Sequence, residues 1–281
     1  MRKYIKPLIP SFLLRLRSIA KDKVELAKIE KIPCDTDLVA SASQINLEEI
    51  FYSEEYGEEW KEVEREISSL SISDKASGVN PGDRRVLYYL VRHLRPRAVL
   101  EIGTDIGASA VHIAAALRML NSSVSEVSHT LVTVDIRDVN DVRSKPWVEG
   151  GSTYSPIDMM NKLGCDEIAT FTTNWSLNYF ENCEQKFDLI FLDGNHWSST
   201  VYQEIPASLK VLNKGGWILL HDYFPDLKPL WSNKALVPGP YLATNRLQSE
   251  GEDIKVLPLG RLPWPTKLNS NVTSLALLGK H

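Results

Sequence analysis

The amino-acid sequence predicts an α/β fold built on a mostly parallel β-sheet. Short apolar segments alternate with helical segments between residues 83 and 222, and this order places helices on both faces of a parallel sheet. Several of the apolar segments are hydrophobic throughout, as expected for strands buried on both faces. A chain of 281 residues is long enough for one such domain with additions at its ends.

Each element of this domain has its own signal in the sequence. Apolar residues at helical spacing predict helices, and short continuous apolar runs predict strands. The predicted helices are RRVLYYLVRHL (84–94), ASAVHIAAALRML (108–120) and VYQEIPASLKVL (201–212). The predicted strands are AVLEIG (98–103), HTLVTVDI (129–136), ATFTTN (169–174), FDLIFLD (187–193), GGWILLHD (215–222) and VTSLALLG (272–279).

Residues 1–80 are predicted to form a helical extension that precedes this domain, which covers 81–281. Ser11 is a suitable N-cap for an amphipathic helix. Because residues 1–31 carry nine Lys or Arg against three Asp or Glu, this helix could pack on its own domain, in a homodimer or on a membrane surface. Its apolar positions are Phe12, Leu13, Leu16, Ile19, Ala20, Val24 and Ala27.

Residues 48–66 reverse this charge, with nine Glu and two basic residues. Aromatic residues interleave with the acids at helical spacing, which predicts a helix docked on the main domain; a lid over a pocket is the alternative. Pro81 is a suitable first residue for the helix that follows.

Two long connections, 136–168 and 224–270, are predicted to shape a substrate site. Both are rich in Pro, Gly, Trp and Tyr. In open α/β sheets, ligands bind beyond the carboxyl ends of the strands, where long connections supply contacts. The side chains expected to line an acceptor pocket are Tyr154, Trp197, Tyr223, Trp231, Tyr241, Arg246 and Trp264.

The composition excludes several classes of protein. A net charge of -4 and a pI near 5.9 argue against a broad nucleic-acid-binding surface. No apolar run approaches the length that spans a bilayer, which is roughly 18 to 20 residues. The three cysteines have no disulfide or zinc spacing, so a cytoplasmic location is expected.

The turn after the first predicted strand contains a candidate cofactor motif. The segment VLEIGTDIGASA has the form E-x-G-x-x-x-G, and Asp105 stands where a dinucleotide fingerprint requires glycine. The motif resembles the first motif of class I S-adenosylmethionine-dependent methyltransferases. The resemblance implies that this loop binds S-adenosylmethionine through Glu101, Gly103, Thr104, Gly107 and Ser109.

Two further segments extend this resemblance. Asp135 ends the second strand, where an acid can accept both ribose hydroxyls, although an Asp that begins a turn is the alternative. Trp175 and Ser176 follow the third strand, at the turn that flanks the adenine in this superfamily; a core tryptophan is the alternative. The resemblance covers about residues 80–222 and the last strand, and it implies a Rossmann-like, mostly parallel, seven-stranded sheet.

Two acids end neighbouring strands and form a candidate metal site. Asp193 and Asp222 are expected to project over the same sheet edge, and hard oxygen ligands suit Mg²⁺. The layout DGNHWSST…GG…HDY resembles the DGD…ST…GG…DDY of macrocin-type O-methyltransferases, a metal-dependent branch that also includes catechol O-methyltransferases. Asn195 or His221 is the expected third ligand, and imidazole would shift the preference towards Mn²⁺ or Fe²⁺.

His196 is the candidate general base, and Asp193 is expected to serve both catalysis and cofactor binding. A hydroxyl is a poor nucleophile at neutral pH, so its methylation requires a base, a metal ion or both. An enzyme that uses His196 without metal is one alternative, and a turn histidine bonded only to backbone is another.

The expected activity is therefore O-methylation of a small molecule. A sugar hydroxyl of a glycosylated natural product or saccharide is the favoured acceptor, and a phenol is the second. A metal-dependent oxidoreductase of the cephalosporin hydroxylase type is an alternative, because an imidazole lies near each acid. A non-catalytic module is a third, against which the joint presence of Glu101, Gly103, Asp135, Asp193 and Asp222 argues.

Overall fold

The computed structural model describes residues 11–72, 78–122 and 128–281. Its centre is a seven-stranded sheet in the order β3-β2-β1-β4-β5-β7-β6. The first five strands of this order run parallel, whereas β7 is antiparallel to both neighbours, so the predicted mostly parallel sheet is confirmed. The strands are β1 (Ala98–Ile102), β2 (Thr130–Asp135), β3 (Ala169–Thr173), β4 (Phe187–Leu192), β5 (Leu212–Leu220), β6 (Lys255–Pro258) and β7 (Ala276–Gly279).

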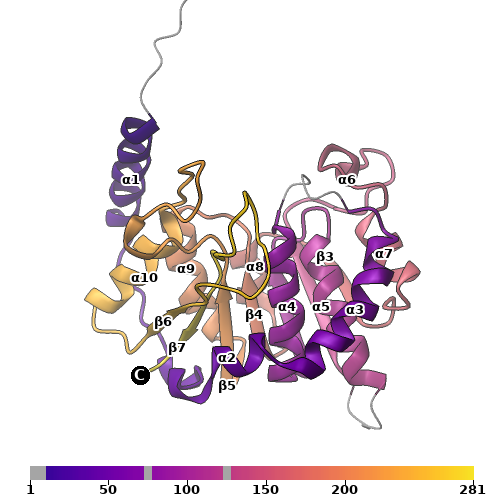
Figure 1. The fold of residues 1–281 in the computed structure, drawn as a ribbon. Coiled ribbons are helices and arrows are strands. Elements are labelled where there is room, and N and C mark those ends of the chain that lie inside the picture. Colours follow the sequence, from indigo (N-terminus) through magenta and orange to yellow (C-terminus); the bar gives the residue numbers. More distant parts are fainter. Residues whose placement is uncertain (1–10, 73–77, 123–127) are drawn as a thin grey trace, which may run out of the picture.

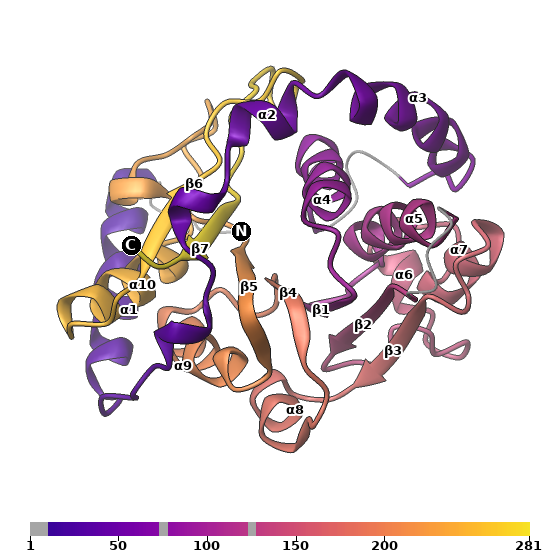
Figure 2. The same cartoon turned by 90° about the horizontal axis from the view of Figure 1, so that it is seen from below.

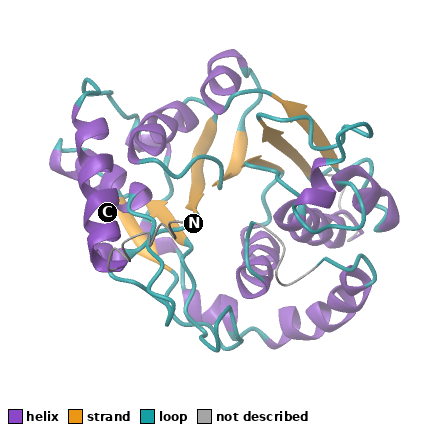
Figure 3. Cartoon of the chain, turned by 90° about the horizontal axis from the view of Figure 1, so that it is seen from above, coloured by secondary structure: helices purple, strands orange, loops and turns teal. Residues whose placement is uncertain are grey.

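Helices cover both faces of this sheet (Figures 1, 2 and 3). Figure 2 shows α4 and α5 on one face, with α2 and α3 outside α4 and α5, and α8 and α9 on the other face. The helices are α1 (Ser11–Ala27), α2 (Leu47–Phe51), α3 (Glu54–Ser68), α4 (Pro81–Leu94), α5 (Ala108–Ser122), α6 (Pro146–Glu149), α7 (Pro156–Lys162), α8 (Ser176–Asn182), α9 (Ser198–Leu209) and α10 (Gly239–Ser249), with short 3₁₀ turns at Thr36–Leu38, Ala42–Gln44 and Pro225–Leu227.

The alternation of side chains along each strand produces two hydrophobic cores. Val99 of β1 and Leu189 of β4 belong to the core beneath α4 and α5. Leu100 and Ile190, one position further along the same strands, belong to the core beneath α9 and α10. Successive strand residues point to opposite faces, so both faces must be apolar when helices cover both. This explains the continuous apolar runs in the sequence.

The strand order reverses at β1, and the reversal determines where a ligand can bind. From β1 the chain proceeds to β2 and β3 on one side, and then returns to β4 and β5 on the other. The connections that leave β1 and β4 therefore diverge and open a crevice at their carboxyl ends. Candidate residues from the two halves of the chain meet at this crevice.

The segment 48–66 is docked on the main domain, as expected. It forms two helices rather than one: α2 ends at Phe51, and Ser53 caps α3 by accepting a hydrogen bond from the Tyr56 N–H. Trp60 of α3 is buried, and Arg92 of α4 donates two hydrogen bonds to Glu59 of α3 at 2.7 and 2.6 Å. No residue of α3 lines the cavity at the carboxyl ends of the strands.

The first helix also packs on its own domain. Its C-terminal end lies beside α9 and α10 (Figure 1), and Leu26 is buried there. Leu13, Leu16 and Val24 of the predicted apolar face are exposed. Residues 1–10 and 73–77 of the predicted extension lie outside the described residues. Within the described ranges, no helix has the length and apolar character needed to cross a bilayer.

The connection 224–270 contains elements that the sequence did not reveal. It forms α10 and the edge strand β6, which pairs with β7. Strand β6 has four residues and no fully buried position, so it lacks an apolar run. Trp264 of this connection, an expected pocket residue, is instead in the core between Phe51 and Tyr89, and its Nε1 donates to the Gly82 carbonyl at 3.0 Å.

We expect Trp264→Ala to lower the free energy of unfolding by about 3–5 kcal/mol, because it removes a buried aromatic side chain and leaves a cavity. Chemical denaturation measures this loss. Trp197→Ala is the matched control: its side chain is 51% exposed, and the loss there should stay below about 1 kcal/mol. Equal losses in the two variants would contradict the placement of Trp264 in the core.

Candidate active site

A cavity of about 1000 Å³ opens at the carboxyl ends of β1, β2, β4 and β5. One wall carries the predicted cofactor residues Gly103, Asp135, Trp175 and Ser176. Another part of the wall carries Asp193, Asn195, His196, His221 and Asp222. The fold therefore brings the two sets of sequence-predicted residues to one space.

Gly103 makes the approach between these walls possible. Its φ of +99° favours glycine, and a Cβ there would lie 2.2 Å from the backbone oxygen of Asp193. Gly107 also has a positive φ of +78°, and a Cβ there would lie 2.8 Å from the Pro156 side chain. Gly107 does not line the cavity; it allows α5 and α7 to pack closely.

Three other predicted cofactor residues have side chains that point beneath the loop. Glu101 is fully buried and accepts a hydrogen bond from Thr133 Oγ1 at 2.5 Å, and the Ser109 hydroxyl also bonds to it. Thr104 Oγ1 lies 2.6 Å from the same Thr133 hydroxyl. Burial raises the pKa of Glu101 to about 8. These side chains support the loop from below, so only their backbone atoms could serve a ligand in the cavity.

Asp135 is held at the rim by backbone N–H groups. The Asp105 N–H donates to its Oδ2 and the Arg137 N–H to its Oδ1, both at 2.9 Å. Each carboxylate oxygen can accept more than one hydrogen bond, so both retain capacity toward a ligand. The orientation of Asp135 therefore suits a pair of hydroxyls.

Trp175 and Ser176 begin α8 at the cavity wall. Trp175 is 64% exposed, so the alternative of a core tryptophan is wrong. Behind Ser176 lies Glu204 of α9, which also lines the cavity and accepts a hydrogen bond from the Ser176 hydroxyl. Burial raises the pKa of Glu204 to about 7. Glu204 was not predicted, because its only signal in the sequence is an acid among apolar residues in VYQEIPASL.

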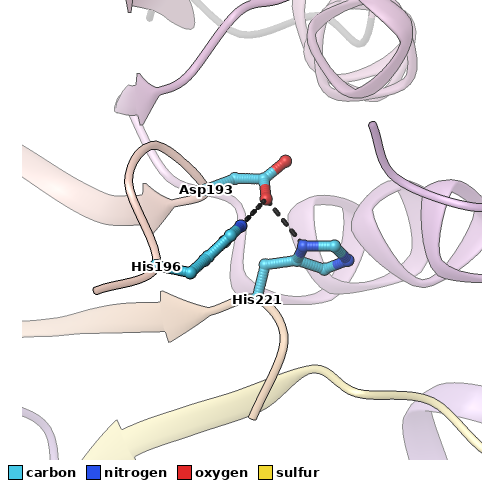
Figure 4. Close-up of side chains that lie close together, drawn as sticks. All are labelled: Asp193, His196 and His221. Carbon is cyan, nitrogen blue, oxygen red and sulfur yellow. Dashed lines mark ion pairs between the residues drawn. The ribbon is translucent and has the colours of Figure 1, made fainter. Parts of the chain in front are cut away.

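Asp193, His196 and His221 converge at the other wall (Figure 4). Asp193 Oδ1 lies 2.6 Å from His221 Nδ1 and 3.4 Å from His196 Nε2. Burial alone would lower the pKa of His221, but the carboxylates of Asp193 and Asp222 outweigh it and raise that pKa to about 10. Burial alone would raise the pKa of Asp193, and His221 and His196 lower it overall. Opposite charges therefore compensate for burial in this group.

Asp222 and Asn195 lie next to this group but turn partly away. Asp222 has a φ of +52°, and its Oδ1 accepts a hydrogen bond from the Ser274 hydroxyl at 3.2 Å. Its Oδ2 lies 3.9 Å from His196 Nε2. Asn195 Oδ1 accepts from the Trp197 N–H at 2.9 Å, so the turn itself already uses this oxygen. The other expected third ligand, His221, has its Nδ1 2.6 Å from Asp193 Oδ1.

Asp83 is a residue of this region that the sequence patterns do not reveal. It lies in the first turn of α4, fully buried, with Oδ2 3.9 Å from His221 Nε2. Asn80 Nδ2 donates to the same oxygen at 2.6 Å. Burial raises the pKa of Asp83 to about 6. In the sequence, Asp83 is an ordinary acid near a helix start, and only the tertiary structure shows His221 beside it.

The turn between β4 and α9 is held by two distant segments. A Cβ on Gly239 of α10 would lie 1.9 Å from the His196 backbone oxygen, so only glycine fits there. From α1, Asp22 Oδ1 accepts a hydrogen bond from the Ser198 N–H at 2.8 Å, and the Ser198 hydroxyl donates to the Asp22 carbonyl at 2.9 Å. The extension and α10 thus fix the turn that carries His196.

The expected acceptor residues do not line the cavity that the structure describes. Ile136 and Arg137 are the lining residues from 136–168, and none comes from the described residues of 224–270. The lining of this cavity includes none of Tyr154, Trp197, Tyr223, Trp231, Tyr241, Arg246 and Trp264. The aromatic content of the long connections predicted a pocket at the sheet edge. These side chains instead lie in the spaces between helices and loops or on the surface.

The chain resembles known proteins in sequence family and in fold. Residues 100–223 match a family described as a methyltransferase domain. The structure is similar to the O-methyltransferase TomG from Streptomyces achromogenes, which is involved in tomaymycin synthesis and was solved with SAM (16% identity, 95% of this chain and 98% of that chain, TM-score 0.50). It is also similar to an O-methyltransferase from Bacillus cereus solved with SAH (16% identity, 95% and 100%, TM-score 0.52). At this identity the likeness shows a shared fold. No curated protein matches the sequence.

We expect Glu101→Gln to change how stability depends on pH. The folded-state pKa of Glu101 is raised, so between pH 4.5 and about 8 the folded protein keeps a proton that the unfolded chain loses. The free energy of unfolding of the native protein therefore falls across this window, and the variant should lack this contribution. Urea titrations measure the free energy of unfolding of both proteins. The value for the variant minus the value for the native protein should rise by at least about 1 kcal/mol from pH 4.5 to 8.

The exposed Glu62→Gln is the matched control and should give a difference that does not change with pH. If the two variants give the same pH dependence, Glu101 does not hold a proton in the folded state.

Proposed function

We propose that the chain is a class I methyltransferase that transfers the methyl group of S-adenosylmethionine to a hydroxyl oxygen of a small molecule. The strand order and the match of residues 100–223 to a methyltransferase domain support this proposal. The observation that carries this proposal is that Gly103, Asp135 and Trp175 line the same cavity as Asp193 and His196. One space is thus available to a nucleoside cofactor and to a hydroxyl beside a base.

The cofactor would lie along the first wall of the cavity. The backbone near Gly103 leaves room for the amino-acid part, and the Asp135 carboxylate is oriented for the ribose hydroxyls. The exposed ring of Trp175 suits stacking on adenine, and Ser176 lies next to it. Glu101, Thr104, Gly107 and Ser109 would act on the cofactor only through the shape of the loop.

His196 would accept the proton of the acceptor hydroxyl. In the transfer, the acceptor oxygen forms a bond to the methyl carbon while the carbon–sulfur bond breaks, and its electron pair stays on sulfur as a neutral thioether. The hydroxyl proton moves to His196 Nε2, which is partly exposed in the cavity. The resulting imidazolium would be stabilised by Asp193 at 3.4 Å and Asp222 at 3.9 Å.

A sugar hydroxyl of a glycosylated natural product or saccharide is the acceptor that we favour. Near His196 the cavity is lined by Asn195, Thr200 and Asp222, which are hydrogen-bonding side chains. Such a lining suits an acceptor with several hydroxyl groups, whereas a phenol would gain more from aromatic walls. A phenol therefore remains the second acceptor class.

A divalent metal ion is a further part of the proposal. Asp193 and Asp222 supply the hard oxygen atoms that Mg²⁺ prefers, but the atoms closest to the Asp193 carboxylate are imidazole nitrogens. The residues fit a metal ion, with the histidines as members of the donor set. A bound ion would supply Lewis acidity that lowers the pKa of the acceptor hydroxyl.

An oxidoreductase is the second candidate function. The grouping of Asp193 with His196 and His221 favours it, since two histidines and one carboxylate form a donor set found in iron-dependent oxygenases. Anaerobic metal analysis and an oxygen-dependence assay would separate the two candidates. Oxygen consumption that depends on iron would favour the oxidoreductase.

We also propose a cytoplasmic location and a homodimer. The cysteines Cys34, Cys165 and Cys183 are all free, which fits a reducing compartment. The exposed Leu13, Leu16 and Val24 of α1 give a surface on which a second copy could pack. Residues 1–80 would then serve assembly as well as support of the catalytic domain.

Titration of the chelator-treated protein with S-adenosylhomocysteine tests the proposal first. We expect micromolar binding, and Asp135→Asn should weaken it by about tenfold or more, because one charge-assisted acceptor is lost. Asp138→Asn, at an exposed position in the same loop, is the matched control. Absence of binding to the native protein would overturn the methyltransferase proposal.

We expect His196→Gln to lower kcat by about 10²–10⁴ while S-adenosylhomocysteine affinity stays unchanged, because only the proton transfer is lost. Transfer of labelled methyl groups to a panel of saccharides and phenols identifies the acceptor for this measurement.

Asp193→Ala should abolish turnover, while the variant still binds S-adenosylhomocysteine. The exposed His281→Gln is the control, and full activity in Asp193→Ala would refute the assigned roles.

A further inference from the structure

We propose that Asp193, His196 and His221 form a binding site for a borderline divalent transition-metal ion, such as Zn²⁺, Co²⁺, Mn²⁺ or Fe²⁺, and that Asp83 orients His221 within it. The ion would act on the hydroxyl of the proposed methyl transfer, and in that respect the inference rests on the proposed function. Its ligands and its class of ion differ from the Asp193 and Asp222 pair expected to hold Mg²⁺.

The three side chains already have the spacing of a metal site. One candidate ligand atom from each lies within 4.8 Å of the others. Figure 4 shows the two imidazole rings converging on one oxygen of Asp193, with distances of 2.6 Å to His221 Nδ1 and 3.4 Å to His196 Nε2. Asp193 follows β4, His196 lies in the next turn, and His221 follows β5. The sheet edge therefore assembles the donors without further movement of the backbone.

His221 provides an independent indication of a ligand. The residue is 7% exposed and lines the cavity, yet its Nδ1 has no hydrogen-bond partner among the described residues. Its contact on this side is the ion pair with Asp193 Oδ1 at 2.6 Å. A metal ion bound by both groups would take the place of the Nδ1 proton, because imidazole binds metal in its neutral form.

Asp83 lies on the opposite side of the same ring. Its Oδ2 is 3.9 Å from His221 Nε2, and the carboxylate is held by Asn80 and by the Thr273 hydroxyl. Metal-binding histidines commonly direct their second nitrogen toward a carboxylate, which fixes the ring and its tautomer. With Nε2 directed toward Asp83, metal binding would displace the Nδ1 proton of His221, and the lone pair would then face Asp193 and His196.

The donor set selects the class of ion. Two imidazole nitrogens and one carboxylate oxygen suit Zn²⁺, Co²⁺, Mn²⁺ or Fe²⁺, whereas Mg²⁺ prefers oxygen ligands throughout. Asn195 Oδ1 accepts a hydrogen bond from the Trp197 N–H, and Asp222 Oδ1 accepts one from the Ser274 hydroxyl. Asp222 Oδ2, which lies 3.9 Å from His196 Nε2, is placed to accept a hydrogen bond from water or from the acceptor.

His196 links this site to the chemistry of the cavity. Its Nε2 has one lone pair, which can accept the acceptor proton or bind an ion, but not both at once. The metal-free protein would rely on His196 as the base, and the metal-loaded protein would rely on the ion's effect on the hydroxyl. The two states should therefore differ in which substitutions abolish turnover.

Titration of the chelator-treated full-length protein with Co²⁺ tests the site without an activity assay. We expect one equivalent to bind with visible absorption bands that indicate nitrogen and oxygen ligands at low coordination number. Zn²⁺ should displace it, and Mg²⁺ should compete at least about tenfold more weakly than Zn²⁺. Competition by Mg²⁺ as strong as that by Zn²⁺ would overturn the proposed donor set.

Substitutions assign the ligands. His196→Ala, which is at a partly exposed position, should weaken Co²⁺ binding by about 100-fold, and Asp83→Asn by about 10–100-fold. His281→Ala is the matched control, because this histidine forms an exposed pair with Asp253 at 2.9 Å. Unchanged affinity in both His196→Ala and Asp83→Asn would overturn the proposal, since binding would then occur elsewhere.

Titration of the same samples with S-adenosylhomocysteine separates the two proposals. If the cofactor binds but Co²⁺ does not, the metal site is wrong and the methyltransferase proposal stands. If Co²⁺ binds at the assigned residues without any cofactor binding, the site is supported and methyl transfer is not. Normal cofactor affinity in His196→Ala and Asp83→Asn also shows that both variants are folded.

Discussion

The close contact between Gly103 and the backbone of Asp193 is the constraint on which the site depends. It joins the loop after β1 to the turn after β4, across the point where the strand order reverses. Any side chain at position 103 would separate these two segments, because a Cβ would overlap the Asp193 carbonyl. The distance between the proposed cofactor wall and the reactive wall is therefore set by backbone packing.

A second constraint is electrostatic. Asp83, His221, Asp193 and His196 alternate between carboxylate and imidazole from the interior to the cavity. Each buried charge on its own would be costly, and the opposite charge beside it offsets that cost. The arrangement keeps polar groups ordered at the end of an apolar sheet, and it leaves His221 Nδ1 facing the cavity.

The N-terminal extension also helps to hold the site in place. Asp22 of α1 binds the backbone and hydroxyl of Ser198, and Gly239 of α10 lies against His196. Elements far from the motifs in the sequence thus hold the turn that those motifs share. This gives the extension a structural role in the site, whatever partner its exposed apolar residues contact.

Local sequence patterns determined the α/β class, six of the strands and the main helices. They also placed Asp135, Asp193 and Asp222 at the sheet edge. The reason is that burial on both faces imposes continuous apolar runs that end at polar turns. Those patterns could not reveal β6, a short edge strand without an apolar run, nor Glu204 and Asp83, which resemble ordinary helix acids. They also assigned Trp264 to a pocket rather than to the core. Only the tertiary structure decided which side chains share the cavity, because that depends on contacts between residues far apart in the chain, such as His221 with Asp83.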